Sequence, residues 1–231
     1  MAVERDLDGW TVAFDLDGTL VDSAPDLIGT LNRMLAQYDL PPRPVEAARH
    51  LVGHGAMALL RDGFLEAGAA WDEARAPGLF ERFIADYSAH IADDSRVFDG
   101  VVQALDQLAT RGAILCVATN KRTDLSVALI AALGLTRHFA FIAGPDAVDA
   151  KKPDGAHIRR AVERAGGDPS RAIMVGDSTT DTAAAKDASI PCVVVGFGYN
   201  DVPRDRLGGD AVIDSYAALN AVVSDMVFGA A

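Results

Sequence analysis

The sequence predicts an α/β protein whose doubly wound, mostly parallel sheet carries an inserted helical subdomain. Short apolar runs alternate with stretches of helical spacing over most of the chain. Residues 23–96 break this alternation, because they contain helical patterns and no convincing strand. The length of 231 residues suits one domain with a smaller insertion and does not suit two or three independent domains.

Six short apolar runs are typical of strands that are buried on both faces of a sheet. Most of the helical stretches between them begin with Asp or Thr near the start, as helix N-termini prefer. Together these features predict a Rossmann-like core. The expected strands are Trp10–Phe14, Ala113–Ala118, Phe139–Ala143, Ala172–Val175, Ile190–Val195 and Ala211–Ile213. The expected helices are Val101–Arg111, Thr123–Leu133, Asp154–Ala165 and Thr179–Ala188, with one more helix closing the chain.

The insertion is expected to hold helices over residues 24–38, 45–52, 54–66 and 72–91. The proline-rich stretch Leu40–Pro44 predicts a stiff connector between the first two. We therefore expect an α/β core of residues 1–22 and 97–231 and a helical cap of residues 23–96.

The charge balance excludes some classes of partner. Lys and Arg number 21 against 33 Asp and Glu, which gives a formal net charge of −12. This excess argues against binding to nucleic acid or to an anionic membrane, because both need clustered cations. No stretch approaches about 18 uncharged apolar residues, and the N-terminal residues lack an apolar signal region, so we expect a cytoplasmic protein. Cys116 and Cys192 lie in apolar runs without the spacing of a metal site, and the oligomeric state is not indicated.

Acidic side chains follow two predicted strands, at the edge of the sheet where ligands bind in folds of this class. Asp15 and Asp17 are two residues apart, so an extended backbone places both carboxylates on the same side. Gly18 then permits a tight turn. Asp177 and Asp181 follow the fourth predicted strand, across an expected helix N-terminus.

Candidate anion-binding groups follow the other strands. Thr119 and Asn120 offer a hydroxyl and an amide that can donate to an anionic oxygen, although ending the strand and capping the next helix are alternative roles. Lys151 and Lys152 lie in a later loop, where a lysine offers a point charge for phosphate. Their adjacency leaves the choice between them open.

Converging carboxylates predict a cation, because like charges raise one another's pKa. Oxygen ligands without His or Cys favour Mg²⁺. A divalent cation, a lysine and neutral donors together suit phosphoryl transfer. In that chemistry Asp15 attacks to form an aspartyl-phosphate, and Asp17 protonates the leaving oxygen and later activates water.

These motifs resemble those of the haloacid dehalogenase-like superfamily, specifically its small-molecule phosphatases with a helical cap after the first strand. The resemblance covers essentially the whole chain. Asp15–Thr19 is similar to the first motif, Thr119 to the second, Lys152-Pro153 to the lysine motif, and Gly176-Asp177 with Asp181 to the metal motif. Val52–Gly55, Val97–Val101 and Gly196–Tyr199 look most like segments of phosphoglycolate phosphatases.

The resemblance implies a role for each matching residue. Asp15 is the nucleophile and a ligand of Mg²⁺, Asp17 is the acid/base and a ligand through its backbone carbonyl, and Asp177 is the third protein ligand. Asp181 is expected one layer behind the metal, with charge compensation at the helix start as an equal alternative. Phosphate is expected to bind to Thr119, Asn120 and Lys152. The proline that follows Lys152 selects this lysine over Lys151. Gly155 departs from the many relatives that have a second proline, which leaves the shape of that loop open.

The expected function is a Mg²⁺-dependent phosphatase for a small phosphate monoester, with 2-phosphoglycolate as leading substrate on the resemblance alone. A β-phosphoglucomutase-type transfer or a pyrophosphatase is the alternative enzyme, and a non-catalytic phosphometabolite sensor is the alternative of another class. His54 is left out of the expected site, because capping or packing explains it equally well. A surface position is favoured for Arg61 over contact with a substrate carboxylate.

Overall fold

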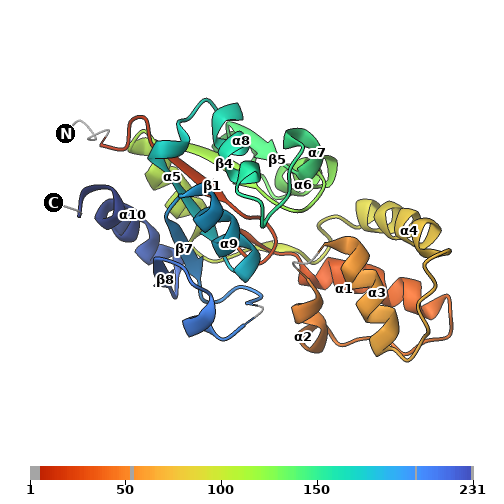
Figure 1. Ribbon diagram of the computed structural model, residues 1–231. Helices are drawn as coiled ribbons and strands as arrows, with labels where there is room; N and C mark the ends of the chain where they lie inside the picture. Colours follow the sequence, from red (N-terminus) through yellow and green to blue (C-terminus); the bar gives the residue numbers. More distant parts are fainter. Residues whose placement is uncertain (1–5, 53–54, 201, 230–231) are drawn as a thin grey trace.

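The computed structural model describes residues 6–52, 55–200 and 202–229. Within them a six-stranded parallel sheet has the order β5-β4-β1-β6-β7-β8, which places the first strand in the middle (Figure 1). The predicted doubly wound α/β fold is therefore confirmed. The strands are β1 Thr11–Phe14, β4 Ile114–Ala118, β5 Phe141–Ala143, β6 Ala172–Gly176, β7 Cys192–Val195 and β8 Ala211–Ile213.

Helices cover both faces of this sheet, because alternate strand residues point to opposite sides. Val12 and Phe14 belong to one hydrophobic core, with α5 Val101–Thr110, α6 Thr123–Ala132 and α10 Leu219–Phe228. Ala13 faces the other core, which α8 Ala156–Arg164 and α9 Thr179–Ala188 complete. All four residues of β1 are buried, as expected of a central strand.

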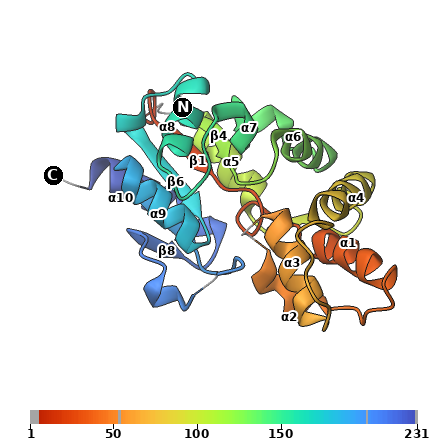
Figure 2. The same cartoon turned by 45° about the vertical axis from the view of Figure 1, so that its right-hand side comes forward.

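The inserted helices have a hydrophobic core of their own, in which Ile28, Leu31 and Phe83 are fully buried. Figures 1 and 2 show them gathered at one end of the molecule. Assigning residues 23–96 to a cap and the rest to a core remains a prediction. The helices are α1 Ala24–Ala36, α2 Val45–Ala48, α3 Ala56–Glu66 and α4 Ala76–Ala89.

A two-stranded ribbon at the base of the insertion was not expected from the sequence. β2 Val21–Asp22 pairs antiparallel with β3 Arg96–Val97, so the insertion does contain strand residue Arg96. Strands of two residues are too short to show an apolar alternation. The expected helix over residues 45–52 is instead α2 followed by a 3₁₀ turn, Arg49–Leu51.

Other boundaries differ by a few residues. The fourth inserted helix starts at Ala76, where a proline in the first turn favours helix initiation. A 3₁₀ turn, Thr136–His138, shortens the expected third strand, and a short helix, α7 Pro145–Val148, follows it. His54 lies outside the described residues.

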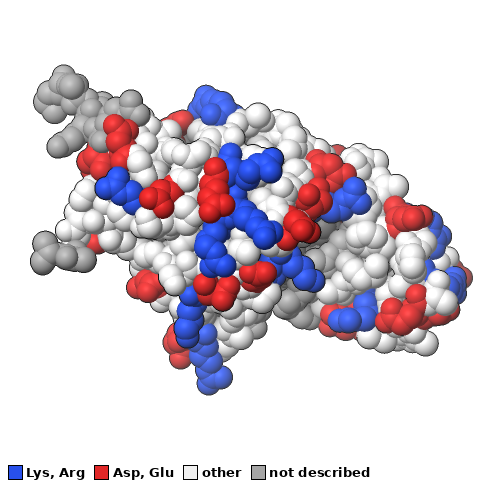
Figure 3. Space-filling view, turned by 45° about the horizontal axis from the view of Figure 1, so that its top comes forward, with Lys and Arg blue, Asp and Glu red and all other residues white. Residues whose placement is uncertain are grey.

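Charged side chains of both signs share the surface. On the face in Figure 3, a band of Lys and Arg side chains is flanked by Asp and Glu side chains. The basic band on that face is therefore bordered by negative charge. In the part of the chain that the structure describes, no helix is both long and apolar enough to cross a membrane.

Candidate active site

Three loops at one edge of the sheet bring the predicted residues together. Asp15 and Asp17 follow β1, Thr119 follows β4 and Asp177 follows β6, and these three strands are neighbours. Their carboxyl ends lie at the same edge because all are parallel. The backbone N–H of Asp15 donates to the carbonyl of Val175 at 2.9 Å, which continues the pairing of β1 with β6 into the loop.

The turn after Asp17 requires a glycine. Gly18 has φ +84°, a conformation that costs L-residues energy. A Cβ at this position would lie 2.5 Å from Oδ2 of Asp177. The glycine thus allows the first motif to approach the metal motif closely.

Three acids form a buried cluster. One carboxylate oxygen each of Asp15, Asp177 and Asp181 lies within 4.8 Å of the others. Burial, together with the charges of Asp181 and Asp15, raises the pKa of Asp177. Burial also raises the pKa of Asp15 to about 6, against the opposing charge of Lys152.

Asp177 is held by neutral donors. The Thr19 hydroxyl donates to its Oδ1 at 2.9 Å, and the backbone N–H of Tyr199 donates to its Oδ2 at 2.7 Å. These bonds orient the carboxylate without supplying a positive charge. Positive charge from the protein does not reach Asp177 through these bonds. The carboxylate oxygens of the cluster are ligands that Mg²⁺ prefers.

Lys152 is the cation that the cluster does have. It is 3% exposed, and its Nζ lies 2.7 Å from Oδ1 of Asp15 and 2.6 Å from Oδ1 of Asp181. Burial works against the charge, but the carboxylates of Asp15 and Asp181 outweigh it and raise the pKa of Lys152. Lys151 is exposed. The geometry thus agrees with the choice of Lys152.

Asn120 pairs with the backbone of the loop that carries Lys152. Its Nδ2 donates to the backbone carbonyl of Lys152 at 2.9 Å, and its Oδ1 accepts from the backbone N–H of Lys152 at 2.9 Å. The oxygen and one N–H of the side-chain amide thus hold the lysine loop, and Asn120 also lines the cavity. Thr119 is buried and lines the cavity.

Asp181 forms a capping box at the start of α9. Its Oδ2 accepts from the backbone N–H groups of Asp177 and Ser178 at 3.1 Å each, and from the Ser178 hydroxyl at 2.8 Å. Because Oδ1 contacts Lys152, both oxygens of Asp181 have protein partners. Asp181 therefore accepts hydrogen bonds at the helix start and is also a member of the acid cluster.

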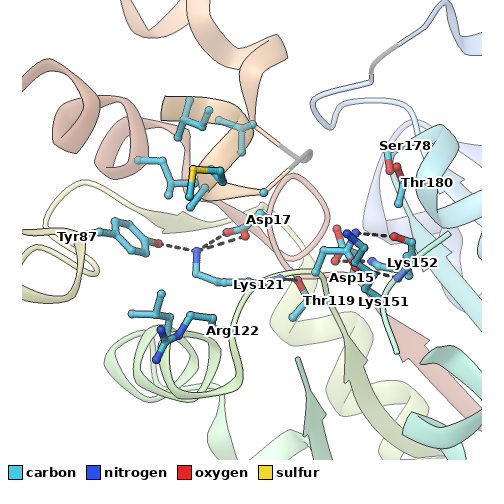
Figure 4. Close-up of a pocket in the computed structure, with 18 of the residues that line it drawn as sticks. Asp15, Asp17, Tyr87, Thr119, Lys121, Arg122, Lys151, Lys152, Ser178 and Thr180 are labelled. Carbon is cyan, nitrogen blue, oxygen red and sulfur yellow. Dashed lines mark hydrogen bonds and ion pairs between the residues drawn. The ribbon is translucent and has the colours of Figure 1, made fainter. Parts of the chain in front are cut away.

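Lys121 is a site residue that the sequence analysis missed. Its Nζ lies 3.1 and 3.2 Å from the two oxygens of Asp17 and 2.7 Å from the Tyr87 hydroxyl, which comes from α4 (Figure 4). The Ser23 hydroxyl also donates to Asp17, at 2.5 Å. The position next to Thr119-Asn120 was the one available signal, because the partners of Lys121 are distant in sequence.

A cavity of about 450 Å³ opens between the sheet edge and the inserted helices. Asp15, Asp17, Thr119, Lys121 and Lys152 line its polar side (Figure 4). Apolar side chains of the insertion line the other side: Leu27, Val52, Met57, Leu59, Phe80, Phe83 and Ile84. Arg61 does not line it and pairs with Asp62 on the surface, as favoured.

A family model described as haloacid dehalogenase-like hydrolase matches residues 12–195. The chain belongs to this family. The match runs from β1 through β7 and so includes the acid cluster, Lys121 and Lys152.

Relatives of this haloacid dehalogenase-like hydrolase agree with the resemblance that the motifs indicated. A phosphoglycolate phosphatase of Caulobacter vibrioides is 52% identical over 216 residues, which are 94% of this chain and 91% of the relative. One of Agrobacterium fabrum is 46% identical, covering 89% and 88%. The crystal structure of a predicted phosphoglycolate phosphatase from Haemophilus somnus has a TM-score of 0.84 at 28% identity, over 94% of this chain and 98% of that one. The expected family is confirmed.

Proposed function

We propose that this protein is a Mg²⁺-dependent phosphatase that hydrolyses 2-phosphoglycolate to glycolate and phosphate. The proposed chemistry rests on the position of Asp15. Its buried carboxylate lies between Lys152 and the other acids of the cluster, and Asp15 and Asp17 both line the cavity. The substrate is supported by the relatives named phosphoglycolate phosphatase at 52% and 46% identity. A cytoplasmic location remains a prediction.

The acids suit a divalent cation held by the carboxylates of Asp15 and Asp177 and by the backbone carbonyl of Asp17. Burial and mutual repulsion raise the pKa of both Asp15 and Asp177, and a nearby cation would relieve that repulsion. Bound there, Mg²⁺ supplies charge neutralisation for the phosphoryl oxygens. Asp181 holds the residues around the metal and does not bind the metal itself, because its oxygens already accept from Lys152 and from the backbone at the start of α9.

Asp15 then serves as the nucleophile. Its carboxylate oxygen attacks phosphorus, the bond from phosphorus to the ester oxygen breaks, and Asp17 gives that oxygen a proton. Lys152 and Thr119 donate to the phosphoryl oxygens, while the side chain of Asn120 holds the lysine loop in place. We thus give Asn120 a positioning role.

Hydrolysis of the aspartyl-phosphate completes the cycle. Asp17 takes a proton from water, the water oxygen attacks phosphorus, and the bond to Asp15 breaks, which releases phosphate and restores the carboxylate of Asp15 and the protonated form of Asp17. The apolar side chains of the insertion limit access of bulk water to this step. The insertion would act as a cap in this way.

Phosphate release from a panel of substrates tests the proposal. The panel contains 2-phosphoglycolate, β-glucose 1-phosphate, pyrophosphate and nucleoside monophosphates, each with Mg²⁺ and with EDTA. We expect selective release from 2-phosphoglycolate that EDTA abolishes. Release from another member alone would keep the mechanism and discard the substrate. Metal binding without any release would favour a sensor.

Calorimetric titration with Mg²⁺ tests the metal site separately from turnover. Asp177→Asn removes a charged ligand and should weaken Mg²⁺ binding at least tenfold. Asp205→Asn, at an exposed position in the loop after β7, is the matched control and should leave the binding unchanged. Equal affinities in both variants would contradict the assignment of Asp177.

A further inference from the structure

Two buried lysines line the cavity, and only one is accounted for by the phosphate. Lys152 lies on the side of Ser178 and Thr180, whereas Lys121 points toward Tyr87 of the insertion (Figure 4). The Lys121 side chain is 6% exposed. Of the other cations that line the cavity in the described residues, Arg122 and Lys151 are exposed. Among the described residues, Lys121 is thus the buried cation on the side of the cavity that faces the insertion.

Lys121 retains a donor for a ligand. An ammonium group has three N–H donors. The two oxygens of Asp17 lie at nearly equal distances, 3.1 and 3.2 Å, as when one N–H is shared between two acceptors. A second N–H serves the Tyr87 hydroxyl at 2.7 Å. No third acceptor is found among the described residues, so the third N–H is left for a group in the cavity.

The surroundings of Lys121 restrict what that group is. The described side chains that the insertion contributes to the cavity are apolar apart from the Tyr87 hydroxyl. In the proposed reaction Asp17 hydrogen-bonds to the leaving oxygen. Lys121 in turn forms an ion pair with Asp17. A substituent on the carbon next to the leaving oxygen therefore comes within reach of Lys121. An anion there would meet a cation in a site of low water content, where such a contact is strong.

We infer that Lys121 binds a carboxylate on the leaving group and so selects phosphate esters of short 2-hydroxy acids over uncharged esters. This inference rests on the proposed function, and it deepens it by assigning the specificity to the core loop after β4. The same lysine orients Asp17. Recognition of the carboxylate and placement of the acid/base are thereby carried out by one side chain.

The test compares 2-phosphoglycolate with ethyl phosphate, in which a methyl group replaces the carboxylate. The kcat/KM ratio of the two substrates is measured for the wild type, K121M and K121Q. We expect both variants to lose roughly tenfold to a hundredfold of the preference for 2-phosphoglycolate, the usual effect of losing a charge-assisted contact. K121Q can still hydrogen-bond to Asp17 and Tyr87, and it keeps the test readable should K121M fail to fold.

The ratio separates recognition from positioning. Loss of Asp17 orientation slows both substrates alike, so an unchanged ratio in K121Q would overturn the inference. R137M is the matched control: it removes an exposed cation outside the cavity that pairs with Asp106, and the ratio should stay at the wild-type value. Glycolate inhibition gives a second readout, since its Ki should rise in K121Q while that of inorganic phosphate does not.

Failure of the proposed substrate is visible before any variant is made. A wild type that releases phosphate from other esters but not from 2-phosphoglycolate would discard that substrate and this inference together. A wild type active on 2-phosphoglycolate, with a preference that K121Q and K121M leave intact, would overturn the role of Lys121 alone.

Discussion

The backbone N–H of Tyr199 donates to Oδ2 of Asp177 at 2.7 Å. The hydroxyl of the same tyrosine donates to Asp22 at 2.9 Å and accepts from the backbone N–H of Ala24 at 2.8 Å. Arg49 of the insertion contacts the two oxygens of Asp22 at 2.7 and 2.9 Å. One residue therefore connects the acid cluster with the base of the inserted helices.

Tyr199→Phe should weaken the base of the insertion and spare the metal site. It leaves the backbone N–H of Ala24 without its side-chain partner and removes one donor from Asp22. We expect the free energy of unfolding to fall by about 1–3 kcal/mol in urea denaturation, while Mg²⁺ affinity stays within about twofold because the backbone bond to Asp177 remains. Tyr38→Phe, at a half-buried position, is the control and should cost less. Equal losses would contradict the connecting role of Tyr199.

Gly18→Ala should impair both stability and turnover. The substitution adds strain at φ +84° and puts a Cβ 2.5 Å from Asp177 and 2.8 Å from the Tyr199 ring. We expect a loss of about 1–2 kcal/mol of unfolding free energy and at least a tenfold drop in phosphate release, since the loop that carries Asp17 must shift. Gly78→Ala lies in α4 with open space around it and should be neutral or stabilising. Full activity in Gly18→Ala would refute the close approach as a requirement.

His157 should make stability depend on pH. It is fully buried, its Nδ1 donates to the carbonyl of Ala150 at 2.7 Å, and its Nε2 has no partner among the described atoms. Burial lowers its pKa from 6.5 to about 4. Between these two values the unfolded chain binds more protons than the folded one, so the free energy of unfolding rises with pH and levels off above 6.5. The contribution is about 3 kcal/mol.

Urea denaturation between pH 4 and pH 7.5 measures this contribution. His157→Gln should flatten the dependence relative to the wild type, whereas His90→Gln, at a half-buried position, should retain it. A wild-type slope that persists in His157→Gln would mean that other groups cause it.

The sequence predicts the site residues whose positions are set by the ends of the parallel strands. Asp15 and Asp177 directly follow strands of the sheet, and Lys152 lies in the connection after β5 and α7. Parallel topology brings such positions together whatever their sequence separation. The contacts of Lys121 with Tyr87 depend on how the insertion packs over the core, and no local pattern encodes that packing. The pairing of the Asn120 amide with the backbone of Lys152 was not predicted for a related reason, since a free amide and one that pairs with the backbone look the same in sequence.

The central claim is that Asp15 forms a covalent aspartyl-phosphate, and mass spectrometry of acid-quenched enzyme tests it most directly. Wild type, D15N and D17N are each mixed with 2-phosphoglycolate and Mg²⁺ and quenched before turnover is complete. The account predicts a phosphoryl group on the peptide that contains Asp15, enriched in D17N because that variant lacks the base for hydrolysis, and absent from D15N. D15N that releases phosphate at the wild-type rate, or a phosphoryl group on another residue, would contradict it.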